Sequence, residues 1–123
     1  MEVCCGNIAS VRAAIEGGAD RVELCRDLEL DGLTPSREMI GEAVGLCHPA
    51  GLLVHVLIRS REGDFVYDDT EVKKMADEIG MAIAEGADGV VVGALTPGGD
   101  IDTAACRKWI DAVRQAVGDQ RHN

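Results

Sequence analysis

The chain has 123 residues, of which 46% are hydrophobic, so we expect one packed domain rather than a disordered segment. A formal net charge of −10 and only three aromatic residues (Phe65, Tyr67 and Trp109) argue against a nucleic-acid partner, which would need a basic face or stacking rings. No run approaches the roughly 18 apolar residues of a membrane span and the N-terminus lacks a signal-peptide pattern, so we expect a soluble cytoplasmic protein without a membrane partner.

Short apolar runs alternate with helical periodicity along the chain. In chain order, the pattern predicts strands at residues 2–5, 21–25, 52–58 and 89–92. It predicts helices that begin after the N-cap Asn7, at Thr34-Pro35, near Val72 and near Asp102. Four consecutive strand–helix units indicate an α/β fold with a parallel sheet covered by helices. We expect a single domain over residues 1–117 and a tail at 118–123.

The two faces of each predicted strand differ in polarity. Residues two apart share a face, and one face collects charged, thiol and imidazole side chains: Glu2, Cys4, Arg21, Glu23, Cys25, His55 and Arg59. The opposite face is apolar and includes Cys5. An open sheet with helices on both sides should be apolar on both faces. The pattern therefore favours (β/α) units of the TIM-barrel type, with a polar interior and a site at the carboxyl ends of the strands.

The number of units fits half of such a barrel. Residues 16–22 and 85–90 form a weak internal sequence repeat. In each copy a predicted helix ends at glycine, and the chain turns through Ala-Asp into a strand. A full barrel takes about 250 residues, twice what four units supply. Two edge strands would then be open to pairing with another chain. We expect either self-association through these edges or a shortened form of a longer barrel.

Two thiols, Cys4 and Cys25, end adjacent predicted strands on the polar face. Neighbouring strands lie about 4.8 Å apart, so both thiolates can bind one soft ion. The chain has no CxxC motif, which favours low-coordinate Cu(I) over tetrahedral zinc, and His55 could add a nitrogen from deeper in the third strand. The alternatives are two reduced cysteines packed under a loop, or a disulfide between them.

A second candidate site follows the third predicted strand. Arg59 and Arg61 leave this strand, and Asp64 lies in the turn that follows. Arginine pairs bind carboxylates or phosphates bidentately, and Asp64 could hold one of the two guanidinium groups in place. The alternative is a surface loop with weak salt bridges.

Two carboxylates, Glu2 and Glu23, occupy the polar face one step below the thiols. Close carboxylates can raise one another's pKa, which suits acid–base chemistry. The alternative is that each pairs with an arginine, such as Arg59 or Arg21. The two carboxylates and the arginine loop together define a candidate pocket for an anion or substrate, made up of Glu2, Glu23, His55, Arg59, Arg61 and Asp64.

Five ordered sequence blocks match a known family. They are EVC at 2–4, GGADRVELC at 17–25, GLTPS at 32–36, IRSREGDFVY at 58–67 and GADGVVVGALT at 86–96. Together they resemble the CutC family of copper homeostasis proteins. The resemblance implies a TIM-barrel fold and Cu(I) binding through the cysteines at positions 4 and 25.

The chain also departs from the family pattern. Cys5 is not expected there, and Ser60 and Glu62 stand where the family usually has proline and glycine. The family's second half, including a block with adjacent His and Arg, has no counterpart here. If that block carries an enzymatic activity, this chain alone lacks it, so no activity is assigned. The alternative function is a TIM-barrel enzyme, or the remnant of one, that acts on a small anionic molecule.

Overall fold

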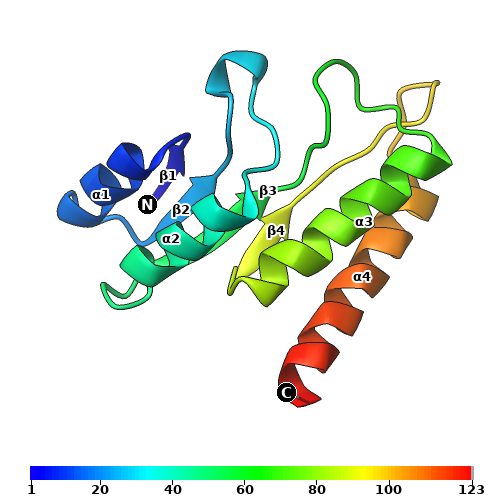
Figure 1. The fold of residues 1–123 in the computed structure, drawn as a ribbon. Coiled ribbons are helices and arrows are strands. Elements are labelled where there is room, and N and C mark those ends of the chain that lie inside the picture. Colours follow the sequence, from blue (N-terminus) through cyan, green and yellow to red (C-terminus); the bar gives the residue numbers. More distant parts are fainter. Residues whose placement is uncertain (123) are drawn as a thin grey trace.

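The computed structural model describes residues 1–122 and the side chains of residues 1–119, and its strands and helices alternate along the chain (Figure 1). The elements are β1 (Glu2–Cys5), α1 (Ile8–Glu16), β2 (Arg21–Leu24), the 3-10 helix η1 (Leu28–Leu30), α2 (Arg37–Cys47), β3 (Leu53–Leu57), α3 (Asp69–Ala84), β4 (Gly89–Val91) and α4 (Thr103–His122). The predicted order of four strand–helix units is confirmed. The short helix η1, in the loop after β2, was not predicted.

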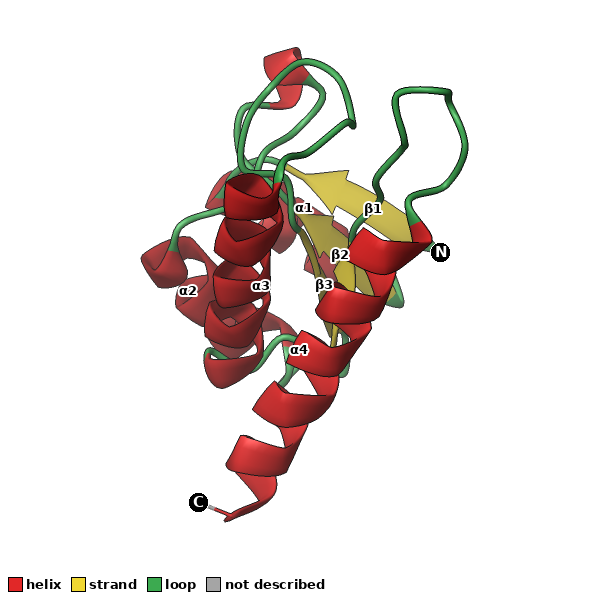
Figure 2. Cartoon of the chain, turned by 90° about the vertical axis from the view of Figure 1, so that its right-hand side faces the viewer, coloured by secondary structure: helices red, strands yellow, loops and turns green. Residues whose placement is uncertain are grey.

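The four strands form one parallel sheet in the order β1-β2-β3-β4. Helices α1, α2 and α3 lie along one face of this sheet (Figures 1 and 2). Side chains on that face are fully buried, as at Val22 and Val54, whereas Leu53 on the opposite face is 48% exposed. One apolar and one open face is the arrangement of a partial TIM-barrel unit, in which the open face belongs to the barrel interior.

Side-chain caps determine where the first three helices begin. Asn7 accepts a hydrogen bond from the Ser10 amide at 2.8 Å and caps α1, as predicted. The cap of α2 is Ser36, which accepts from the Met39 amide, and not Thr34. Thr34 is unavailable because its hydroxyl already bonds elsewhere, as described below. Asp68 begins α3 with a reciprocal capping box.

Helix α4 packs against α3 and continues through residues 118–122, which the sequence pattern assigned to a tail; residue 123 lies outside the described residues. Trp109 attaches α4 to the domain, because it is only 1% exposed and its indole Nε1 donates to the Val72 carbonyl at 3.1 Å. Its ring also meets Tyr67 edge-on, with centroids 6.2 Å apart.

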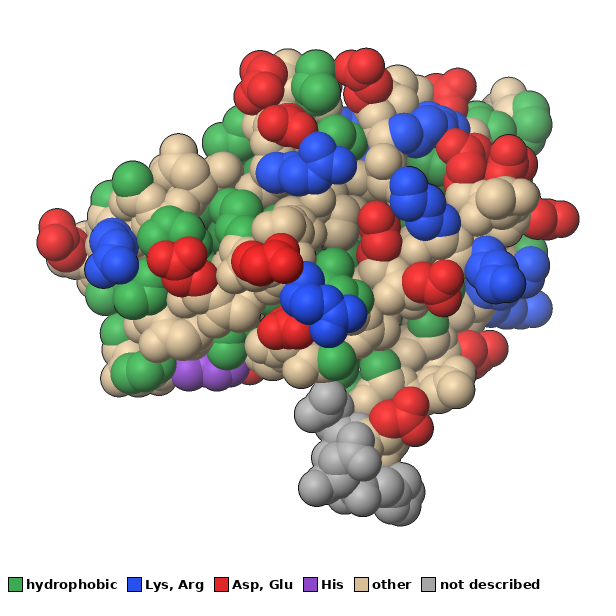
Figure 3. All heavy atoms as spheres, viewed as in Figure 1, with side chains coloured by type: hydrophobic (Ala, Val, Ile, Leu, Met, Phe, Trp, Pro, Cys, Tyr) green, Lys and Arg blue, Asp and Glu red, His purple; other side chains and the backbone are tan. Residues whose placement is uncertain are grey.

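The core fills the layer between the sheet and the helices. Cys5, which the strand pattern assigned to the apolar face, is fully buried in it, and so is Cys47, so both thiols pack as small hydrophobic side chains. None of the helices among residues 1–122 combines the length and apolar character that a bilayer crossing needs. On the face shown in Figure 3, acidic and basic side chains are interspersed.

Candidate functional site

The open face of the sheet carries a row of polar side chains across three strands. In the register of the sheet, Cys4 on β1 lies beside Glu23 on β2, and Glu23 lies beside His55 on β3. Glu2 lies beside Arg21, one pleat closer to the amino ends of the strands. This row confirms that the residues share one face, which follows from the two-residue period of a strand.

The register corrects one expectation about the thiols. Cys4 is level with Glu23, and Cys25 lies two positions further along, just after β2. Both thiols therefore share one face of the sheet, but they are not cross-strand partners. Strand register is set by side-chain packing and loop geometry, so it cannot be predicted from where each strand ends. The Cys25 thiol is 3.8 Å from the Cys5 carbonyl oxygen, and the Cys4 thiol is 3.8 Å from Glu23 Oε2.

The electrostatics of this face disfavour the thiolate form of both cysteines. Burial raises the pKa of the Cys4 thiol, and the negative charges of Glu23 and Glu2 raise it further. Burial also raises the pKa of the Cys25 thiol, followed by the effects of Cys4 and Glu23. The Glu23 carboxylate thus raises the pKa of both thiols, and Cys4 also raises that of Cys25. A cation bound between them would relieve this concentration of negative charge.

The two carboxylates of the face have different surroundings. Glu2 accepts from Arg21 Nε at 2.5 Å, so the alternative of an arginine partner holds for this residue. Glu23 has no arginine partner among the described residues. Burial and then the charge of Glu2 raise the pKa of the Glu23 carboxyl, whereas His55 acts in the opposite direction. The surroundings of Glu23 therefore favour the neutral form of its carboxyl group.

Arg59 lies two residues beyond β3 and is only 5% exposed. Its Nη1 donates to the carbonyl oxygens of Leu30 at 2.7 Å and Gly32 at 3.2 Å, and its Nη2 donates to that of Gly63 at 2.9 Å. The guanidinium therefore joins the loop after β2 to the loop after β3. Its carbon Cζ lies 5.1 Å from the centroid of the Phe65 ring.

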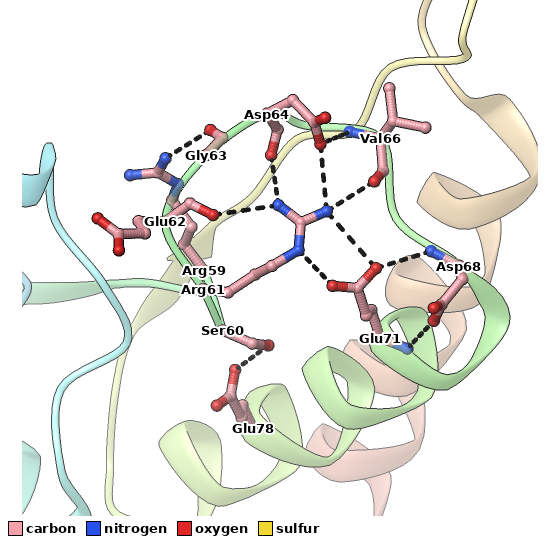
Figure 4. Close-up of polar contacts among 10 residues, drawn as sticks. All are labelled: Arg59, Ser60, Arg61, Glu62, Gly63, Asp64, Val66, Asp68, Glu71 and Glu78. Atoms are coloured by element: carbon pink, nitrogen blue, oxygen red, sulfur yellow. Dashed lines mark hydrogen bonds and ion pairs between the residues drawn. The ribbon is translucent and has the colours of Figure 1, made fainter.

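Arg61 has the opposite surroundings, with carboxylates on two sides (Figure 4). It pairs with Glu71 of α3 and with Asp64 at 3.2 Å, and donates to the Val66 carbonyl at 2.7 Å. The pKa of the Glu71 carboxyl is lowered, mainly by its hydrogen bond from Arg61. Asp64 holds Arg61, as anticipated, but the guanidinium is committed to bracing its own loop. Arg59 and Arg61 are therefore not arranged to bind one anion together.

A polar cluster behind this loop escaped the sequence analysis. Glu78 Oε1 on α3 accepts from the hydroxyls of Thr34 and Ser60, each at 3.0 Å, and the Thr34 hydroxyl accepts from the Arg59 amide at 2.8 Å. One sequence feature could have predicted this cluster: Glu78 comes immediately before Ile79, which belongs to the apolar stripe of α3. These bonds join the carboxyl end of β3 to α3 and fix where Arg59 leaves the sheet.

The comparison with known families agrees with this arrangement. A model described as the CutC family matches residues 1–119. The chain belongs to the CutC family. Two curated relatives, each named family protein CutC, come from Pasteurella multocida and Xylella fastidiosa; they are 46% and 45% identical to this chain over 113 residues, or 92% of it. The matches cover 45% and 41% of those relatives, so this CutC chain spans less than half of their length.

Solved structures share the fold of this CutC chain. A crystal structure described as a copper homeostasis protein CutC from Streptococcus agalactiae superposes with a TM-score of 0.87 at 37% identity, over 92% of this chain and 54% of that one. A protein described as a phosphonomutase from Burkholderia cenocepacia matches 97% of this chain and 49% of its own with a TM-score of 0.60. At 23% identity, this second likeness concerns the fold alone.

Proposed function

We propose that this CutC chain binds Cu(I) through Cys4 and Cys25 and acts in copper homeostasis. The observation that carries the proposal is that Cys4 on β1 and the buried Cys25 just after β2 share one face of the sheet, with the Glu23 carboxylate beside Cys4. The description of the Streptococcus agalactiae structure as a copper homeostasis protein points the same way. We place this activity in the cytoplasm, where thiols stay reduced.

The donor set fits a soft ion of low coordination number. Among the side chains of residues 1–119, no three His, Cys, Asp or Glu groups gather as a ligand set. A structural zinc site needs four ligands, whereas Cu(I) accepts two thiolates. Binding must release the thiol protons, and Glu23 Oε2, 3.8 Å from the Cys4 sulfur, is placed to accept the proton of that thiol. Because the pKa values of both thiols are raised, Cu(I) affinity should rise with pH, by up to about a hundredfold per pH unit for two protons.

The test is an anaerobic Cu(I) titration against a chromogenic competitor. We expect one tight equivalent in the unmodified chain and its loss in both Cys4→Ala and Cys25→Ala. Cys106→Ala is the matched control, because this half-buried thiol lies on α4. Circular dichroism would verify that Cys25→Ala folds. Uptake that neither substitution weakens would refute the proposal.

We further propose that residues 1–117 act as one half-barrel unit and that two copies associate through the open edges of β1 and β4. An apolar groove of about 470 Å³ beside β4 supports this idea; it is lined by Val90, Val92, Trp109 and Ile110, among others. Ile110 is 50% exposed there. Sedimentation velocity should give a concentration-dependent dimer that Ile110→Lys weakens. A compact monomer at all concentrations would contradict the pairing.

A further inference from the structure

Arg59 is a buried cation without a carboxylate partner. It is 5% exposed, yet none of the ion pairs between described residues includes it. Arg61, two residues later and more exposed, has two carboxylate partners. A buried charge is normally compensated by an opposite charge, because otherwise the loss of hydration is not recovered. The position of Arg59 therefore calls for an anion that the described residues do not supply.

The unused donors of Arg59 lie along one edge of the guanidinium. Its five N–H groups comprise two on Nη1, two on Nη2 and one on Nε. Both Nη1 donors and one Nη2 donor bond to carbonyl oxygens of the two loops. The Nε is buried and has no acceptor among the described residues. Tyr67 also lies at the guanidinium: burial raises the pKa of its hydroxyl, whereas the charge of Arg59 and a hydrogen bond with it act in the opposite direction. The Nε donor is therefore the one without a protein acceptor, and with the neighbouring Nη2 it forms the side-on edge that matches two oxygens of a carboxylate or a phosphate.

The surroundings of Arg59 are built to hold this fork in place. Three carbonyl oxygens fix the other side of the guanidinium, and they come from both the loop after β2 and the loop after β3. Arg61 braces the second loop through Asp64, Val66 and Glu71 (Figure 4). These loops follow the carboxyl ends of the strands, the end at which barrels bind their ligands. Such preorganisation lowers the entropic cost of binding.

We propose that Arg59 anchors an oxyanion site that binds the carboxylate or phosphate group of a small molecule through Nε and Nη2. The site is independent of the proposed Cu(I) ligands. Because the Nε is closed to solvent, binding requires the packing over this edge to open. The ring of Phe65 lies over the guanidinium and is 43% exposed, which leaves it room to turn aside.

The Nε–Hε signal of Arg59 in a proton–nitrogen correlation spectrum provides a direct test. Inorganic phosphate and succinate would be titrated separately, with sodium chloride at matched ionic strength as the reference. We expect saturable shifts of this signal and of the Gly63 amide with at least one of the two anions. Arg59→Lys should weaken the Gly63 response at least tenfold, whereas Arg37→Lys, a change at an exposed arginine of α2, should leave it unaltered.

Three results would overturn the proposal. The first is a shift that chloride reproduces. The second is a response spread equally over exposed arginines such as Arg37. The third is an Arg59 signal that changes with protein concentration but not with anion, which would assign the counter-charge to a carboxylate of a second copy. Should Arg59→Lys fail to fold, the wild-type signal still decides, and phosphate or succinate should raise the unfolding temperature of the wild-type chain above that in chloride.

Discussion

Replacement of Trp109 should show how firmly the last helix is attached. Trp109 is the largest fully buried side chain in the described part of the chain, and it joins α4 to α3 through packing, a hydrogen bond to Val72 and an edge-on contact with Tyr67. Truncation of a buried tryptophan to alanine costs about 3–5 kcal/mol. Trp109→Phe keeps a ring against Tyr67 but loses the hydrogen bond, so we expect a loss of about 1–2 kcal/mol.

Urea denaturation followed by far-ultraviolet circular dichroism measures both losses without relying on the chain's single tryptophan as a probe. Trp109→Ala should lower the unfolding midpoint by about 2 M urea, given a typical slope for a domain of this size. Lys108→Ala is the matched control, because this neighbouring side chain is exposed, lies outside the apolar groove and should change stability by less than about 0.5 kcal/mol. Equal, small losses at both positions would refute the described packing of α4.

Three further predictions concern the site face and its supporting elements. Glu23→Gln should stabilise the chain at about pH 7 but not at about pH 3. The raised pKa of Glu23 means that ionisation of its carboxyl group opposes folding once the pH exceeds the ordinary glutamate pKa. Urea unfolding at both pH values tests this, and a lower unfolding free energy of the variant at about pH 7 would contradict it. Gly32→Ala should destabilise by more than about 1 kcal/mol, since this residue has φ +91° and a Cβ there would lie 2.8 Å from the Leu57 side chain; a neutral thermal melt would contradict this. Ser36→Ala should cost about 1 kcal/mol through loss of the cap on the Met39 amide, measured by urea unfolding against Ser10→Ala, whose hydroxyl makes no capping bond among the described contacts.

Local patterns predicted the architecture well. Alternating apolar runs and helical stripes gave the order of strands and helices, and the two-residue period correctly assigned Cys4, Glu23 and His55 to one face and Cys5 to the other. The same reasoning misplaced the cap of α2 and ended the last helix too early. Both errors arise where a local preference competes with a distant partner, as when Glu78 recruits the Thr34 hydroxyl.

The candidate sites were predictable in composition but not in geometry. The sequence pointed to Cys4 and Cys25 and to the arginines after β3. It could not reveal that Cys4 is level with Glu23, because register depends on how neighbouring strands and their loops pack. It placed Arg59, but not Arg61, on the polar face, yet it could not give the partners of either arginine. Only the path of the loops shows that Arg61 is held by Glu71 while Arg59 is buried among carbonyl oxygens.

The sequence by itself determined the strand–helix repeat and the polarity of each strand face, because both follow from periods of two and 3.6 residues along one segment. The tertiary structure decided which polar side chains meet, because those contacts join residues far apart in the chain. Glu23 lies beside Cys4 across 19 residues, and Arg59 reaches Leu30 across 29. No local pattern records such distances, so a buried guanidinium with an unused edge becomes visible only when the loops are brought together.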